Sequence, residues 1–331
     1  MAKWTERNIP SQSGKIAVVT GGSDGIGFHT ALELARKNAN VIIAADREEK
    51  GQQAVARIRA EVPMAQVEYL HLDSADLISV QAFADRLFAS VPQIDILINN
   101  AGVAGVEERK TSPQGFEWHF AANYLGHFAL TARLFPLLFK SPGARIVNVA
   151  SLAHVKAHIH FMDLQLECDY SSKDAYGQSK LAMLLFAREL DRRLRQNSSK
   201  IEAFPVHPGG SKTNIFNHGR ELDGRSAHSP WDILTHLTIS LLGQSAEQGA
   251  LPLLYAATEP QVISGVYYGP DGFKELRGYP APAQVRGEGN DLKIAERLWR
   301  VSESLTGLRF DLAVVPQVSH APEYEPGLLP T

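Results

Sequence analysis

Short apolar runs alternate with longer amphipathic runs along most of the chain. Mostly apolar runs of four to eight residues are typical of buried strands, and apolar residues recurring every three to four positions are typical of helices. Strands are predicted at 15–20, 41–45, 67–72, 94–99, 144–150, 201–206 and 262–268. Helices are predicted near 25–38, 48–61, 77–90, 113–140, 174–196 and 245–257. This alternation predicts parallel βαβ units and hence an α/β fold.

Two segments interrupt the alternation: residues 208–244 and the Pro-rich end after Gly307. Residues 215–242 are amphipathic, which is typical either of a lid over a substrate or of ordinary core packing. A further helix is predicted from a cap at Asn290 to a stop near Gly307. The predicted organisation is an N-terminal extension at 1–13, one domain at 14–307 with a substrate lid at 208–244, and a C-terminal tail at 308–331.

The composition is that of one globular domain with extensions, because 331 residues at 44% hydrophobic content can bury a large core. The single cysteine, Cys168, excludes an intrachain disulfide. A formal net charge of −3 gives no electrostatic basis for nucleic-acid binding, so no nucleic-acid partner is expected. No apolar run reaches about 18 residues, and the start lacks the apolar core of a signal peptide. A cytoplasmic protein without a visible membrane anchor is therefore expected.

A glycine-rich loop follows the first predicted strand and opens the first predicted helix, in Thr20-Gly-Gly-Ser-Asp-Gly-Ile-Gly27. Glycines let a backbone turn tightly and approach a pyrophosphate, and the start of a helix offers free N–H groups to it. The spacing Gly-x-x-x-Gly-x-Gly differs from the general dinucleotide fingerprint. The loop therefore indicates a phosphate cradle, with an ordinary strand-to-helix turn as the alternative.

Tyr176 and Lys180 lie four positions apart and so share one face of a predicted helix. A neighbouring cation favours a phenolate, so a phenol with a free pKa of about 10 is expected to exchange protons nearer neutral pH. Such a group is suited to general acid/base catalysis on a carbonyl or an alcohol.

Together these motifs resemble the classical short-chain dehydrogenase/reductase family. The matching positions are the Thr20–Gly27 loop, Asn99-Asn-Ala-Gly102, Asp73, Asn123, Arg145-Ile-Val-Asn-Val-Ala-Ser151, Tyr176, Lys180, and His207-Pro-Gly209 with Thr213. Within the family, three segments look most like the branch of retinol dehydrogenases, WW-domain oxidoreductases and protochlorophyllide reductases. These segments are 121–128, 247–250 and 266–270.

The resemblance implies a Rossmann-type, doubly wound parallel sheet with helices on both faces, in a single domain with a C-terminal extension. It implies that Tyr176 exchanges the proton, that Lys180 lowers the pKa of Tyr176 and holds the nicotinamide ribose, and that Ser151 stabilises the developing alkoxide. Asn123 either positions a water that leads protons to Lys180 or is a structural asparagine. The implied cofactor-binding residues are Gly21, Ser23, Asp24, Gly25, Ile26, Gly27, Asp46, Arg47, Asp73, Ser74, Asn100, Ala101, Gly102, Tyr176, Lys180, Pro208, Gly209 and Thr213.

The choice between NAD and NADP depends on the end of the second predicted strand. Asp46 there can accept hydrogen bonds from the adenosine ribose, whereas Arg47 can attract a 2′-phosphate. Asp24 adds a second acid in the glycine loop. This balance slightly favours NAD, although the branch that the chain resembles mostly uses NADP.

The predicted function is NAD(P)-dependent interconversion of a secondary alcohol and a ketone on a fairly apolar small molecule, as in a carbonyl reductase. The alternatives are a nucleotide-binding sensor without catalysis, and an epimerase or dehydratase, whose usual Thr-Gly-x-x-Gly-x-x-Gly loop this chain lacks. Oligomeric state is left open, with a homo-oligomer as one outcome, because relatives commonly associate through the helices carrying Asn123 and Tyr176. No metal is expected, because the spacing of His154, His158, His160, Asp163 and Cys168 matches no closed metal site.

Overall fold

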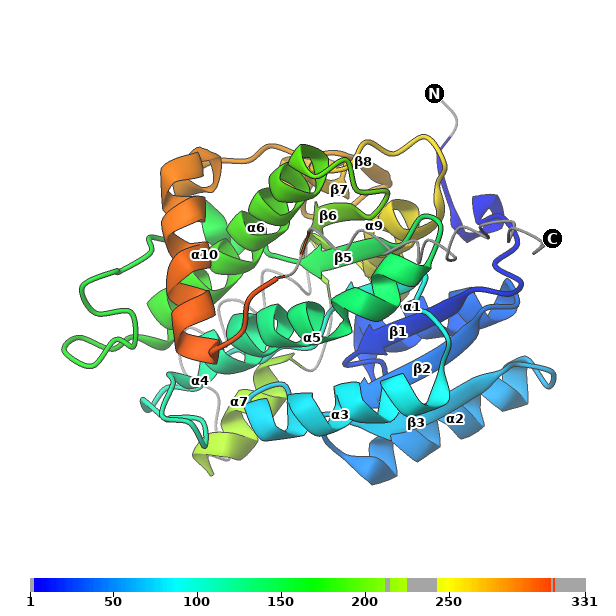
Figure 1. Cartoon of the computed structure of the whole chain (residues 1–331), viewed down its shortest axis with the longest axis horizontal. Coiled ribbons are helices and arrows are strands. Elements are labelled where there is room, and N and C mark those ends of the chain that lie inside the picture. The colour runs from blue at the N-terminus through cyan, green and yellow to red at the C-terminus, as the bar shows by residue number, and fades with distance from the viewer. Residues whose placement is uncertain (1–2, 212–214, 225–242, 311, 313–331) are drawn as a thin grey trace, which may run out of the picture.

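The computed structural model describes residues 3–211, 215–224, 243–310 and 312. Its centre is one eight-stranded sheet with the order β3-β2-β1-β4-β5-β6-β7-β8 (Figure 1). The strands from β3 to β7 are parallel, and β8 pairs antiparallel with β7. The strands are β1 Ile16–Thr20, β2 Asn40–Ala45, β3 Val67–His71, β4 Ile96–Asn99, β5 Arg145–Val149, β6 Glu202–Val206, β7 Tyr268–Pro270 and β8 Pro280–Pro282. The predicted α/β fold with a doubly wound parallel sheet is confirmed.

Helices cover both faces of the sheet because the central strands are apolar on both sides. One face carries α1 Gly25–Arg36, α2 Glu48–Glu61 and α9 Ala246–Thr258, which share a core with β1 and β2. The other face carries α3 Leu77–Ser90, α5 Gly126–Lys140 and α6 Ser172–Gln196. The helix α10 Leu292–Thr306 packs against α6. The shorter helical segments are η1 Glu6–Asn8, α4 Trp118–Phe120, η2 Ala121–Leu125, η3 Leu152–Lys156, α7 Ile215–Asp223, η4 Phe273–Glu275 and η5 Gly287–Asn290.

Side-chain caps set the starts of several helices. Asp24 caps α1, Asp76 caps α3 and Ser171 caps α6, each by accepting a hydrogen bond from a backbone N–H of the first turn. The last helix is capped by Asp291 and not by Asn290 as predicted, because the Asp291 carboxylate accepts from two backbone N–H groups. It ends at Gly307, whose φ of 66° is left-handed, as the sequence predicts.

The prediction and the structure differ in three elements. The strand predicted at 262–268 is wrong over most of its length, because the chain turns at Gly265, with a φ of 80°, and pairs only from Tyr268 onward. The antiparallel edge strand β8 contains prolines at 280 and 282 and was not predicted, since proline is rare in strands. The helix predicted over 113–140 begins only at Trp118, after a turn at Gly115, and passes through the π-helical segment η2.

Both predicted extensions touch the domain. Near the N-terminus, Trp4 packs edge-on against Tyr255, and its indole N–H donates to Glu259 over 3.1 Å. Beyond α10, Phe310 lies 4.6 Å from Trp299, measured between ring centroids. Parts of the predicted lid at 208–244, namely 212–214 and 225–242, lie outside the described residues, as do 311 and 313–331 of the predicted tail at 308–331. Of the helices that are described, none combines the length and the apolarity needed to span a membrane.

Candidate active site

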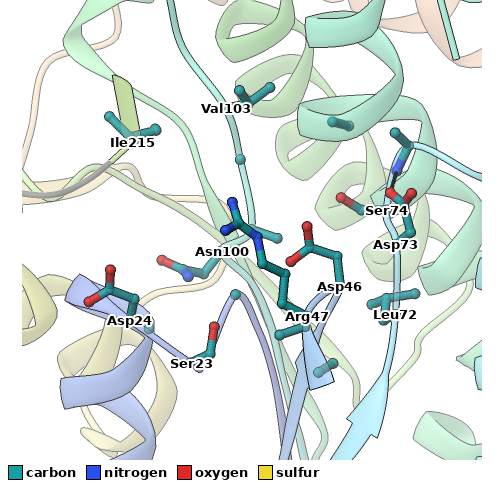
Figure 2. Close-up of a pocket in the computed structure, with 18 of the residues that line it drawn as sticks. Ser23, Asp24, Asp46, Arg47, Leu72, Asp73, Ser74, Asn100, Val103 and Ile215 are labelled. Carbon is teal, nitrogen blue, oxygen red and sulfur yellow. Dashed lines mark hydrogen bonds between the residues drawn. The ribbon is translucent and has the colours of Figure 1, made fainter. Parts of the chain in front are cut away.

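The glycine loop between β1 and α1 forms one wall of a pocket of about 430 Å³ at the carboxyl ends of the parallel strands (Figure 2). Gly21 and Gly25 adopt left-handed φ angles of 64° and 52°, which strain other residues. A Cβ on Gly27 would lie 2.2 Å from the Gly21 carbonyl oxygen and 2.6 Å from the Asn100 amide nitrogen. The loop is therefore an open cradle that side chains would fill, as a phosphate-binding turn requires.

Hydrogen bonds hold the ends of β1 and β4 together beside this cradle. The Thr20 hydroxyl accepts from the backbone N–H groups of Asn100, at 2.8 Å, and Ala101, at 2.9 Å. The Asn100 amide in turn donates to the Thr20 carbonyl at 2.8 Å. These contacts fix the backbone from Asn100 to Gly102, which lines the pocket opposite the glycine loop.

Acidic and basic side chains gather at the far end of the same pocket. Asp46 and Arg47 follow β2 and point into it, and Asp73 follows β3 (Figure 2). Burial raises the pKa of Asp73, although its carboxylate accepts a hydrogen bond from the Ala75 N–H at 2.8 Å. The sequence-predicted residues that line this pocket are Gly21, Ser23, Asp24, Gly25, Ile26, Gly27, Asp46, Arg47, Asp73, Ser74, Asn100, Ala101 and Gly102.

A second pocket, of about 760 Å³, continues from the first, and Ile26, Asn100 and Ile215 line both. Ser151, Tyr176 and Lys180 converge in this second pocket, together with Pro208 and Gly209. Ser151 follows β5, whereas Tyr176 and Lys180 lie one turn apart on α6. The structure therefore brings together all the predicted site residues except Asn123, which lies just behind the pockets, and Thr213, which is outside the described residues.

The electrostatics of Tyr176 and Lys180 differ from the prediction. Burial lowers the pKa of Lys180 to about 8, and its ammonium donates to the Val149 carbonyl at 3.1 Å. The pKa of Tyr176 is raised by burial, with a hydrogen bond to Ser151 opposing the shift. Lys180 Nζ lies 5.9 Å from the centroid of the Tyr176 ring. The predicted lowering of the Tyr176 pKa is therefore wrong for the protein alone, because the loss of hydration on burial outweighs the hydrogen bond to Ser151.

Asn123 lies in the π-helical segment η2, and its amide group is bound by protein on both sides. Its Oδ1 accepts from the Val103 N–H at 2.7 Å, while its Nδ2 donates to the Val103 carbonyl and to Ser179 Oγ, both at 2.9 Å. A Cβ on Gly102 would lie 3.0 Å from Asn123 Oδ1 and 3.3 Å from Lys180 Nζ. These contacts favour the structural alternative for the side chain, which holds the 102–103 segment beside Lys180.

His127 is a buried residue of the site that the sequence analysis did not single out. Its Nδ1 faces the Asn123 carbonyl at 3.2 Å and must donate, so its Nε2 accepts from the Thr20 hydroxyl at 3.0 Å. Burial lowers its pKa from 6.5 to about 4, and the charge of Lys180 adds to the shift. A signal was present, since His127 is four residues, or one helical turn, after Asn123.

This neutral His127 should make the protein sensitive to mild acid. Because the unfolded chain binds the proton from about pH 6.5 and the folded protein only near pH 4, stability should fall as the pH drops through that interval. Between about pH 7 and pH 5, His127→Gln should reduce this loss of unfolding free energy by about 2 kcal/mol. Denaturant unfolding of both proteins at the two pH values measures the difference. Equal pH dependence would contradict the neutral state of His127.

Two histidines of the 154–168 segment, His154 and His158, are bound by protein groups through their side chains. His154 Nδ1 donates to the Ser151 carbonyl over 2.7 Å, and His158 Nδ1 lies 2.7 Å from Glu288. Within the described ranges, no three His, Cys, Asp or Glu side chains are grouped as a metal ion requires. His158 and His160 instead line the second pocket.

Comparison with known proteins links this geometry to one family. Residues 15–223 match the family profile described as short chain dehydrogenase. Human retinol dehydrogenase 13 is 41% identical over 300 residues, covering 89% of this chain and 85% of its own length. Human polyprenol dehydrogenase is 37% identical over 313 residues, covering 92% and 89%.

Solved structures are also similar to this chain. A crystal structure of an uncharacterised protein from Mycobacterium paratuberculosis is 34% identical, has a TM-score of 0.74, and covers 93% of this chain and 99% of its own. A short chain dehydrogenase from Shigella flexneri, complexed with NADP, is 25% identical with a TM-score of 0.57, covering 77% and 96%.

Proposed function

The chain belongs to the short-chain dehydrogenase family, and from this membership and the geometry of the site we propose that it interconverts a secondary alcohol and a ketone with NAD or NADP. The observation that carries the proposal is the continuous pair of pockets. One pocket is walled by an open glycine cradle, and the other holds Ser151, Tyr176 and Lys180.

The residues present suit a dinucleotide. The Gly21–Gly27 loop and the start of α1 would hold the pyrophosphate, and the end of β2 would meet the adenosine ribose. Lys180, which lines the second pocket and lies beside Gly102 of the first, would hold the nicotinamide ribose. When bound, the nicotinamide supplies or accepts the hydride.

The proton chemistry falls to this chain's own side chains. In reduction, the Tyr176 hydroxyl donates its proton to the carbonyl oxygen of the substrate, and in oxidation the phenolate accepts it. Ser151, which is hydrogen-bonded to Tyr176, donates to the same oxygen as negative charge develops on it. The buried Lys180 ammonium stabilises the phenolate through the low-dielectric interior, so it matters most at the moment when Tyr176 is deprotonated.

An apolar substrate suits the second pocket. Its walls include Val149, Ala150, Leu152, Val155 and Ile215, together with the hydroxyl residues Ser151 and Tyr176. The relatives named for retinol and for polyprenol carry the names of apolar alcohols. An apolar alcohol or ketone places its reacting oxygen against Tyr176 and its hydrocarbon part along these walls.

For the cofactor we propose NAD. Asp24 and Asp46 both line the nucleotide pocket, and carboxylates there repel a 2′-phosphate. Arg47 is already engaged in an ion pair with Glu221 of α7, while Lys50 also lines the pocket and acts in the opposite sense. The acidic residues that line this pocket therefore outnumber the basic ones.

Calorimetric titration with NADH and NADPH at fixed salt tests the preference, with several-fold tighter binding of NADH expected. Asp46→Ser should strengthen NADPH binding. Tighter binding of NADPH by roughly tenfold, about 1.4 kcal/mol, would contradict the preference.

The function itself is tested by mass spectrometry of the nucleotide retained on purification, followed by a spectrophotometric screen of apolar ketones and alcohols. Turnover with an apolar secondary alcohol or its ketone is expected. Nucleotide binding without turnover across the panel would instead indicate the sensor alternative.

A further inference from the structure

The helix α7 lines the nucleotide pocket and is tied to the segment that follows β4. The Glu107 N–H donates to the Asp223 carboxylate at 2.8 Å, and Lys110 donates to the Leu222 carbonyl at 2.7 Å. A Cβ on Gly219 would lie 2.1 Å from the Ala104 carbonyl oxygen, so α7 approaches the 104–107 segment closely. The α7 part of the predicted lid is therefore a packed wall of the nucleotide pocket.

One side chain of α7 reaches the residue that would recognise a 2′-phosphate. Glu221 forms an ion pair with Arg47, the residue directly after Asp46 at the end of β2. Both line the pocket, with side chains 54% exposed for Glu221 and 37% for Arg47. The pair is thus open to solvent, and an incoming anion can displace it.

The charged residues around Arg47 determine how the Arg47–Glu221 pair affects nucleotide binding. The ionisable residues lining this pocket are Asp24, Asp46, Arg47, Lys50, Asp73 and Glu221. We propose that Glu221 determines cofactor specificity by competing with the 2′-phosphate of NADP for the Arg47 guanidinium. NAD carries no such phosphate, so it leaves the Arg47–Glu221 pair in place. NADP must displace the Glu221 carboxylate from Arg47 and bind with that negative charge still close to its 2′-phosphate. The inference rests on the proposed nucleotide-dependent function and adds a specificity residue from the lid.

Two variants that each remove one negative charge from α7 separate this competition from a general change in the charge of the helix. Glu221→Gln should tighten NADPH binding roughly fivefold and leave NADH binding within about twofold, since exposed ion pairs contribute up to about 1 kcal/mol. Asp223→Asn removes the same charge two residues away, from a carboxylate that accepts a hydrogen bond from the Glu107 N–H. It should leave the ratio of the two affinities within about twofold of the parent, even if it loosens α7.

A second background makes the test specific to Arg47. Arg47→Met should weaken NADPH binding and abolish the effect of Glu221→Gln, because no guanidinium remains to compete for. Five proteins are titrated with NADH and NADPH by calorimetry at one salt concentration: the parent, Glu221→Gln, Asp223→Asn, Arg47→Met, and the double variant with Arg47→Met and Glu221→Gln.

Three results would overturn the inference: an unchanged affinity ratio in Glu221→Gln, an equal change in Asp223→Asn, or the full effect persisting without Arg47. Failure of the parent to bind either nucleotide is a different result, because it would contradict the proposed nucleotide-dependent function itself.

Discussion

Tyr176→Phe should lower turnover by about 10²- to 10⁴-fold, the range that general acid/base catalysis typically contributes. The substitution removes the proton that would pass to the substrate oxygen but keeps the ring, which lies 6.3 Å from His119 by ring centroids. Nucleotide affinity should change little, because the hydroxyl is placed toward Ser151 and the second pocket. Steady-state kinetics and calorimetry on the same preparation measure both quantities.

Lys180→Met should differ from Tyr176→Phe in its effect on nucleotide affinity. Its ammonium lies beside the junction of the two pockets, so activity and nucleotide affinity should fall together. Turnover of Tyr176→Phe within about threefold of the parent would remove Tyr176 from the mechanism. Unaltered nucleotide affinity in Lys180→Met would contradict its predicted hold on the ribose.

Gly27→Ala should weaken nucleotide binding by about 10- to 100-fold, since a misfit of this kind typically costs about 1–3 kcal/mol. The added methyl would lie 2.2 Å from the Gly21 carbonyl oxygen, a backbone atom of the cradle itself. The loop would have to open at the point where it is expected to hold the pyrophosphate. Calorimetric titration with the preferred reduced nucleotide measures the loss.

Gly143→Ala is the matched control, because a Cβ there meets nothing within 4 Å. It should bind nucleotide like the parent and fold at least as well. Circular dichroism of Gly27→Ala separates a local defect of the loop from general unfolding. A folded Gly27→Ala that binds nucleotide normally would mean that the Gly21–Gly27 turn is not the phosphate cradle.

The sequence predicts most of the sheet because the buried parallel strands are continuous apolar runs. Residues Ile16–Thr20 of β1 are all buried, and the predicted strand at 15–20 begins only one residue earlier. The edge strands lack this signal. At β7 and β8, pairing depends on contacts such as Tyr268 with Pro282 across the end of the sheet, and no local periodicity encodes them.

The candidate site was predictable where its residues belong to local motifs. The glycine loop and the Tyr176–Lys180 turn each lie within one strand-to-helix or helical segment, and the structure places both at the pockets. The pKa of Tyr176 was not predictable, because its direction depends on burial by distant parts of the chain. The Arg47–Glu221 pair joins residues 174 positions apart, so only the fold reveals it.

Transfer of deuterium from labelled reduced nicotinamide to a ketone is the most direct test of the proposed function. Each apolar ketone of a panel is incubated with the labelled nucleotide, and the products are analysed by mass spectrometry. The parent protein should place one deuterium on the carbinol carbon, and Tyr176→Phe should do so at least about 10²-fold more slowly. No label from either nucleotide across a panel of apolar ketones, with nucleotide binding intact, would contradict the proposal that this protein is an alcohol/ketone oxidoreductase.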